Sequence, residues 1–219
     1  MMRLEGATLG YGANVVLRDI DFTLAPGERV VLLGRSGAGK STLLNAIYRR
    51  LVETATDIAL VPQDHGLVPQ LSVFHNVYMG RLDERGALYN LANLAWPFRS
   101  ERQRVARVLD VVGLGGLADK PVETLSGGQR QRTALARAIH RGGRYLIGDE
   151  PVSAVDERQA AELVDEVARR FETIVLALHD VDLARAVATR IVGLKGGRII
   201  VDRPVAELTR QDIDVLYRP

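Results

Sequence analysis

The chain has 219 residues, of which 47% are hydrophobic and 26% charged, a composition typical of a folded protein rather than a disordered one. It contains no cysteine, which excludes disulfides and thiolate metal sites and suits a reducing compartment. With 29 basic and 27 acidic residues, the net charge of +2 is too small to indicate non-specific nucleic-acid binding. No stretch approaches the roughly 20 apolar residues of a membrane-spanning helix, so we expect no direct lipid insertion.

In chain order, the first predicted elements are two strands at residues 3–9 and 15–24, an exposed antiparallel pair joined near Tyr11 to Asn14. Short apolar runs rich in β-branched residues predict four buried strands, separated by helix-like segments, at residues 30–33, 58–61, 145–147 and 173–178. A Lys-Gly-Gly turn at residues 195–197 predicts a late hairpin of residues 191–194 and 198–201. The alternation indicates an α/β fold with a mainly parallel core sheet.

The middle of the chain, residues 72–123, has no strand pattern. Apolar residues recur there at the spacing of one helix face: Val105, Val108, Leu109 and Val112. Ser100 and Gln103 fit a capping box before this helix, and Gly113 fits its end. We therefore predict a single domain, residues 1–219, with an α/β core of residues 1–71 and 124–219 and an inserted α-helical subdomain of residues 72–123.

A glycine-rich segment lies between the predicted strand at residues 30–33 and a helix-like stretch that begins near Thr42. It has the pattern G-x-x-x-x-G-K-[ST], the P-loop of NTPases, in Gly34, Arg35, Ser36, Gly37, Ala38, Gly39, Lys40 and Ser41. Glycines let successive backbone N–H groups face phosphate oxygens, and the following helix N-terminus favours negative charge. Lys40 would neutralise the β- and γ-phosphates, and Ser41 would coordinate Mg²⁺. Alone, the pattern predicts only nucleotide binding, because kinases, GTPases and motors also carry it.

A second anion-binding helix start is predicted further along the chain, where Leu-Ser-Gly-Gly-Gln occupies residues 125–129. This pentapeptide resembles the signature motif of ABC ATPases. The resemblance implies that Ser126, Gly127, Gly128 and Gln129 of one copy complete the site that holds the ATP of a second copy. The alternative is an ordinary helix cap after a glycine turn.

Two carboxylates end the predicted strand at residues 145–147, and a histidine follows the strand at residues 173–178. Asp149, beside the phosphate loop, can hold Mg²⁺. In the ABC family, Glu150 would be the general base and His179 the switch histidine that contacts the γ-phosphate, so Glu150, His179 and Lys40 are the predicted catalytic residues. The alternatives are a solvated acidic pair and a surface histidine.

Two further residues resemble family positions. Gln63, after the strand at residues 58–61, resembles the glutamine that touches Mg²⁺ or the attacking water, and Tyr11 resembles the aromatic residue that stacks on adenine. The arginines after the signature motif, Arg130, Arg132, Arg137, Arg141 and Arg144, are interpreted as a solvated helix face rather than a nucleic-acid face.

One feature departs from the family pattern. Too few residues follow the helix that ends near Leu51 for two further strands before residue 58. We therefore predict a trimmed antiparallel β-subdomain, with less support for Tyr11 in the adenine pocket.

Residues 76–82 and 88–98, with their Trp96-Pro97 pair, are similar to the ATPases of phosphonate importers. The resemblance implies an ATPase subunit with ATP and Mg²⁺ as cofactors. It would work as a homodimer with membrane permease subunits and a substrate-binding protein, peripherally at the cytoplasmic face of the cell membrane. The alternatives are a soluble ABC ATPase acting on nucleic acid or ribosomes, and an ATP-binding module without catalysis.

Overall fold

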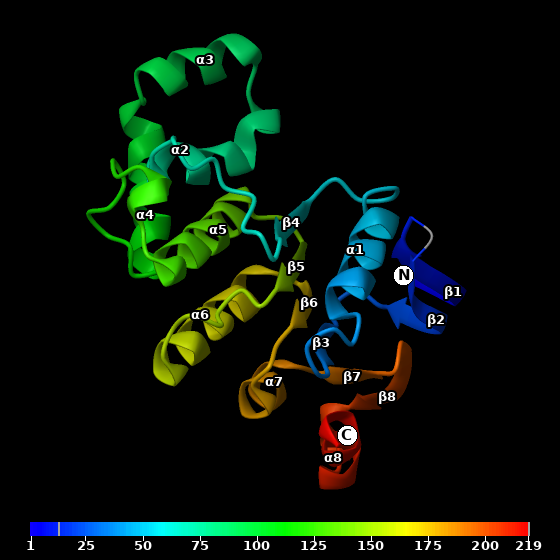
Figure 1. Cartoon of the computed structure of the whole chain (residues 1–219). Helices are drawn as coiled ribbons and strands as arrows, with labels where there is room; N and C mark the ends of the chain where they lie inside the picture. The colour runs from blue at the N-terminus through cyan, green and yellow to red at the C-terminus, as the bar shows by residue number, and fades with distance from the viewer. Residues whose placement is uncertain (13, 219) are drawn as a thin grey trace.

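The structure, a computed structural model, describes residues 1–12 and 14–218. Its core is a six-stranded sheet in the order β4-β5-β6-β3-β7-β8, in which only the β7–β8 pair is antiparallel (Figure 1). The six strands are β3 (Arg29–Leu33), β4 (Ile58–Val61), β5 (Tyr145–Asp149), β6 (Thr173–Ala177), β7 (Arg190–Lys195) and β8 (Arg198–Pro204). The predicted α/β fold, its four buried strands and the late hairpin are confirmed.

Two strands at the N-terminus form a separate antiparallel sheet, β1 (Met2–Tyr11) with β2 (Asn14–Leu24). Ala13, in the predicted connection between them, lies outside the described residues. The chain turns directly from Leu51 back toward β4, with the N–H groups of Thr54 and Ala55 donating to the Leu51 carbonyl. No strand lies between Leu51 and Ile58, so the trimmed antiparallel sheet predicted from the short spacing is confirmed.

Helices occupy the remainder of the chain and pack on both faces of the core sheet. The α-helices are α1 (Lys40–Leu51), α2 (Val73–Tyr78), α3 (Ala87–Ala95), α4 (Arg99–Val111), α5 (Gly127–Arg141), α6 (Glu157–Arg170), α7 (Val181–Val187) and α8 (Arg210–Tyr217). Three short 3-10 helices are η1 (Met79–Glu84), η2 (Val122–Thr124) and η3 (Val205–Glu207). No helix in the described part of the chain is both long and apolar enough to span a bilayer.

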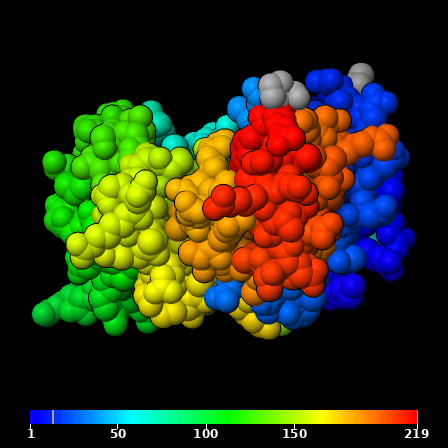
Figure 2. Space-filling model, turned by 90° about the horizontal axis from the view of Figure 1, so that it is seen from below, coloured from blue at the N-terminus to red at the C-terminus, as the bar shows by residue number. Residues whose placement is uncertain are grey.

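The sheet separates two hydrophobic cores. Buried residues of α1 and of the β1–β2 sheet, such as Leu43, Ile47 and Phe22, pack on one face. Residues of α2, α4, α5, α6 and α7, such as Phe74, Leu109 and Leu135, form the other core. In Figure 2, seen from below, α8 lies beside β8, and the helices of residues 72–123 occupy one end of the molecule. The division of the chain into an α/β core and a helical subdomain agrees with this arrangement but stays a prediction.

The start of α4 differs from the prediction. The residue before the helix is Phe98, and Ser100, the predicted cap, lies inside the first turn. The Phe98 N–H donates to Asn93 Oδ1 at 2.8 Å, and its ring packs on Tyr89 at 4.9 Å between centroids. These tertiary contacts fix where the chain enters the helix and override the local capping pattern. The end is as predicted, because Gly113 follows the helix with φ of 65°.

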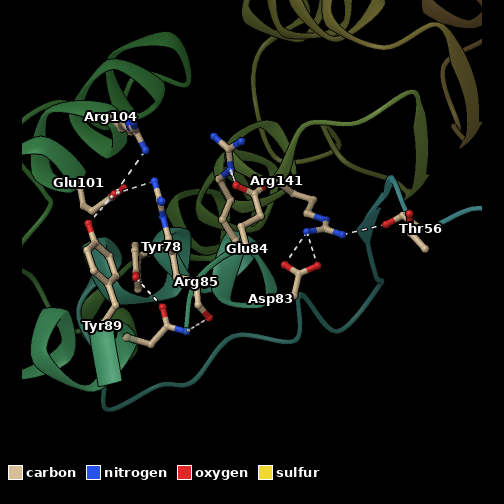
Figure 3. Close-up of polar contacts among 11 residues, drawn as sticks. Thr56, Tyr78, Asp83, Glu84, Arg85, Tyr89, Glu101, Arg104 and Arg141 are labelled. Atoms are coloured by element: carbon tan, nitrogen blue, oxygen red, sulfur yellow. Dashed lines mark hydrogen bonds and ion pairs between the residues drawn. The ribbon is translucent and has the colours of Figure 1, made fainter. Parts of the chain in front are cut away.

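Polar contacts connect the helical region to the core (Figure 3). Arg141 at the end of α5 donates to both carboxylate oxygens of Asp83 at 2.6 and 2.7 Å, and to the Thr56 carbonyl at 2.9 Å. Glu101 is 3% exposed and accepts from Tyr89 Oη at 3.0 Å and from Arg104 at 3.3 Å. Five arginines were expected to form a solvated helix face. The expectation was wrong for the four on α5, which are partly buried and bonded within the chain: Arg130, Arg132, Arg137 and Arg141. Arg144, beyond α5, is exposed and pairs with Asp57.

Candidate functional site

The carboxyl ends of four parallel strands meet at one edge of the core sheet. β3 leads into the glycine-rich loop, β4 into Gln63, β5 into Asp149 and Glu150, and β6 into His179. In open α/β sheets, this edge is where ligands bind. The fold therefore gathers four predicted site segments that lie far apart in the sequence.

The glycine-rich loop adopts backbone conformations that only glycine accepts easily. Gly34, Gly37 and Gly39 have φ of 145°, 78° and 103°. A Cβ on Gly34 would lie 2.4 Å from the Leu194 carbonyl oxygen, and one on Gly39 would lie 2.5 Å from the Leu17 side chain. Since α1 begins at Lys40, directly after the loop, the helix start adds backbone N–H groups that have no acceptor within the helix. Arg35, Ser36 and Gly37 are exposed, whereas Thr42 is buried.

Lys40 is buried at the first position of α1. Its Nζ donates to the Gly34 carbonyl at 2.9 Å and to the Arg35 carbonyl at 3.4 Å. Burial lowers the pKa of Lys40, and the nearby Glu150 and Asp149 carboxylates partly raise it again. Both of these partners are backbone carbonyls, which an ammonium group can exchange for phosphate oxygens.

Oxygen donors suited to Mg²⁺ lie beside the loop. The Ser41 hydroxyl donates to Gln63 Oε1 at 3.4 Å, and Ser41, Gln63 and Asp149 line one cavity of about 620 Å³. Burial raises the pKa of Asp149, the Ser41 hydroxyl lowers it, and the Glu150 charge raises it. Mg²⁺ binds such oxygen donors, together with substrate phosphates and water, so these three residues fit the ion.

Glu150 and His179 face each other across the ends of β5 and β6. Glu150 Oε1 pairs with His179 Nε2, and both side chains are partly exposed. Glu150 has φ of 52°, a left-handed conformation that is rare outside glycine. Its N–H donates to the Ala177 carbonyl at 3.0 Å, which joins the end of β5 to that of β6. A carboxylate fixed beside a histidine can accept a proton from a bound water.

Tyr11 lies at the mouth of the cavity that contains Ser41 and Gln63. Its ring is 54% exposed, and its hydroxyl accepts a hydrogen bond from Asn45 Nδ2 at 3.3 Å. An exposed ring beside the pocket is free to stack on a planar base. The two-stranded β1–β2 sheet thus brings the predicted aromatic residue to the pocket.

The start of α5 forms the second predicted anion site. Ser126 caps the helix: its hydroxyl accepts from the Gln129 N–H at 3.3 Å, and Gln129 Oε1 accepts from the Ser126 N–H at 3.0 Å. Ser126 and Gly127 are exposed, and Gly128 and Gln129 are partly buried. The helix start is therefore open to a ligand on another molecule.

Two residues of α5 at the site were not predicted from the sequence. Gln131 binds the chain at residues 150–154, and Arg137 donates to the carbonyls of His65 and Gly66 at 2.6 and 2.5 Å, just after Gln63. The sequence held a signal for Gln131. It occupies a position on the buried face of α5, in register with Ala134, Leu135 and Ala138, where a polar residue needs a partner.

The sequence of this chain matches known proteins over most of its length. A family model described as ABC transporter matches residues 17–153. A phosphonates import ATP-binding protein, PhnC 1 of Natronomonas pharaonis, is 39% identical, covering 99% of both chains. Another PhnC, of Frankia casuarinae, is 37% identical, covering 99% of this chain and 96% of the relative.

Solved structures with the same fold include cassettes from ABC transporters. A dimeric bacterial ABC transporter cassette has a TM-score of 0.79 and 25% identity, covering 94% of this chain and 99% of that one. A chain of a metal-chelate type ABC transporter in an inward-facing conformation has a TM-score of 0.75 and 26% identity, covering 99% and 88%.

Proposed function

The chain belongs to the ABC transporter family, as an ATP-binding subunit with ATPase activity, and we propose that it powers an importer by hydrolysing ATP between two copies of itself. The observation that carries the proposal is the convergence of Lys40, Gln63, Glu150 and His179 at one sheet edge, together with an exposed, capped helix start at Ser126.

In this proposal, each chain binds the triphosphate of its own ATP. Backbone N–H groups of residues 34–41 hold the phosphates, and Lys40 releases its two carbonyl partners to bind phosphate oxygens. Ser41, Gln63 and Asp149 would hold Mg²⁺, which neutralises charge that develops on the phosphates. Tyr11 would stack on the adenine.

Glu150 would orient the attacking water and accept its proton, while His179 fixes the Glu150 carboxylate and reaches the γ-phosphate. Phosphoryl transfer depends mainly on positioning and charge neutralisation. A base held in one conformation on rigid strand ends meets this requirement.

The second copy would complete each site through Ser126, Gly127, Gly128 and Gln129. A capped helix start presents free N–H groups and a positive dipole end to an anion. Because Ser126 is exposed, this helix start is free to meet the γ-phosphate bound to the other copy. Two ATP molecules would then lie between two chains.

For the transported substrate we propose phosphonates or a related oxyanion, because the relatives named above are phosphonate import proteins. Substrate selection would belong to the permease subunits and a substrate-binding protein. The chain would attach to the permease at the cytoplasmic face of the membrane. The alternative, a soluble ATPase acting on nucleic acid or ribosomes, has no support among these relatives.

The test is Glu150→Gln, which keeps the shape of the side chain but removes its basicity. We expect hydrolysis to fall by about 10²-fold or more, while Mg-ATP binding persists and a dimer accumulates on a sizing column. Glu162→Gln, at an exposed acid of α6, is the matched control and should behave as wild type. Wild-type hydrolysis by Glu150→Gln, or a failure to dimerise with Mg-ATP, would contradict the proposal. Purification from native membranes would then show whether a permease or a nucleic acid accompanies the chain.

A further inference from the structure

Gln131 is a buried polar residue of α5 whose side chain is 5% exposed. Its amide is satisfied by one short segment, residues 150–154. Nε2 donates to the Glu150 carbonyl and, at 2.8 Å, to Ser153 Oγ, while Oε1 accepts from the Ala154 N–H at 2.9 Å. A side-chain amide bound at both ends in this way fixes the backbone that it contacts.

The segment that Gln131 holds begins with the proposed general base. Glu150 has a left-handed backbone that L side chains rarely adopt, with φ of 52°. Within the described residues, its carbonyl accepts from Gln131 and from the Ser153 N–H at 3.4 Å. If the backbone relaxed to an ordinary conformation, the Glu150 carboxylate would turn away from His179.

A second contact joins the same helix to the same segment. A Cβ placed on Gly128 would lie 2.7 Å from the Ala154 carbonyl oxygen, so the start of α5 sits directly against this backbone. The helix that begins at Ser126 is therefore connected to residues 150–154 through the close approach at Gly128 and through the hydrogen bonds of Gln131. A movement of α5 would therefore displace the backbone at Glu150.

We propose that Gln131 is a positioning residue, which holds the backbone of Glu150 in its left-handed conformation and so aims the carboxylate at the bound water. This inference rests on the proposed function, in which Glu150 is the base and Ser126 meets the ATP of the partner. The helix start at Ser126 would contact the ATP of the partner, and Glu150 would act on the ATP of its own chain. Gln131 would then connect these two segments within one chain.

The experiment measures kcat, KM, ATP affinity and thermal stability of Gln131→Met and Gln131→Glu. The Met variant removes all three hydrogen bonds at similar side-chain length, and the Glu variant keeps the size but loses both N–H donors. We expect kcat to fall about 10- to 100-fold, with ATP affinity within about twofold of wild type, and the ATP-bound dimer to accumulate as hydrolysis stalls. Gln103→Met, at an exposed glutamine of α4, should match wild type.

A double variant separates positioning from general stability. In the Glu150→Gln background the base is already absent, so Gln131→Met should lower the residual rate by less than about twofold. An equal fall in both backgrounds would overturn the proposal, as would a kcat within twofold of wild type in the single variants. Loss of folding in both variants, or parallel loss of ATP affinity and thermal stability, would assign Gln131 a structural role instead. Absence of ATP hydrolysis in the wild type would count against the proposed function itself.

Discussion

Glu150 and His65 are two of the three non-glycine residues with positive φ in the described part of the chain; Glu150 is the predicted base, and His65 lies two residues after Gln63. A left-handed conformation costs about 1–2 kcal/mol for an L residue, so nearby contacts must hold it. Gln131 binds the carbonyl of Glu150, and Arg137 binds the carbonyls of His65 and Gly66. Backbone strain is thus concentrated where the predicted base and the loop after Gln63 must be fixed.

His140 gives the fold a pH dependence that can be measured. It is 5% exposed on α5, its Nε2 has no hydrogen-bond partner among the residues that the structure describes, and burial lowers its pKa to about 4. In the unfolded chain the His140 imidazole has a pKa near 6.5. Between about pH 6.5 and pH 4, the unfolded chain therefore binds a proton at His140 and the folded chain does not. The free energy of unfolding should therefore fall as the pH drops, by about 2 kcal/mol from this group between pH 7 and pH 5.

Urea unfolding at both pH values checks this prediction, with His140→Met as the comparison. The Met variant has no group to protonate at this position, so its loss of stability between pH 7 and pH 5 should be smaller by about the same 2 kcal/mol. An equal loss in the two proteins would mean that the imidazole is protonated at no cost in the folded state.

The candidate site residues were predicted from short sequence patterns, from their place after a strand or from family resemblance, and two further residues that contact the site were missed. The residues at 34–41 and 126–129 stand in contiguous patterns, whose chemistry follows from the residue types. Gln131 and Arg137 bind backbone atoms of segments distant in the sequence, and no local pattern specifies such a partner. The sequence also does not show the contacts of Arg137, because in the sequence this residue resembles any arginine of a solvated helix face.

At the scale of elements, α5 connects the segments of the site. It starts at the exposed cap of Ser126, contacts residues 150–154 through Gln131 and the loop after β4 through Arg137, and ends at Arg141. Each contact lies further along one rigid helix. A displacement of its start can therefore reach the other segments without unfolding.

Arg141 should hold η1 against the turn before β4. It forms two hydrogen bonds with Asp83 and one with the Thr56 carbonyl, and its side chain is 21% exposed. In a double-mutant cycle with Arg141→Met and Asp83→Ala, we expect a coupling energy of about 0.5–1 kcal/mol, because one guanidinium nitrogen contacts both carboxylate oxygens but Asp83 is exposed to solvent.

The Arg158 and Glu162 pair on α6 is the control for that cycle. It joins two highly exposed side chains one helical turn apart, and its coupling should be about 0.3–0.5 kcal/mol. A coupling between Arg141 and Asp83 no larger than in this pair would show that the contact does not fix η1.

The elements themselves could largely be predicted because their signals are local. β3, β4, β5 and β6 are short apolar runs buried in the core. Alternation predicted the N-terminal strand pair, and the short interval between Leu51 and residue 58 predicted that no further strands extend its sheet. The predicted start of α4 was wrong, because Phe98 is fixed by Asn93 and Tyr89, which belong to a neighbouring helix. Pairing order within the sheet and contacts between helices depend on the whole chain.

Across the whole chain, two helix starts are predicted to bind anions. One, at residues 34–41, lies with Gln63, Asp149, Glu150 and His179 at the edge of the sheet. The other, at Ser126, begins a different helix and is exposed. We propose that the two belong to different ATP molecules, so that neither chain has a complete site alone.

The measurement that tests this claim most directly is complementation between two inactive variants. Ser126→Ala removes a phosphate contact and should lower hydrolysis by about 10²-fold, and Glu150→Gln removes the base. If Ser126 serves the ATP of the partner, a mixed dimer has one site with both defects and one site with neither. Equal amounts mixed before Mg-ATP is added should then recover about a quarter of the wild-type rate, since about half of the dimers are mixed. A chain carrying both substitutions should stay inactive alone. A mixture that stays as inactive as its two components would show that Ser126 acts on the ATP of its own chain.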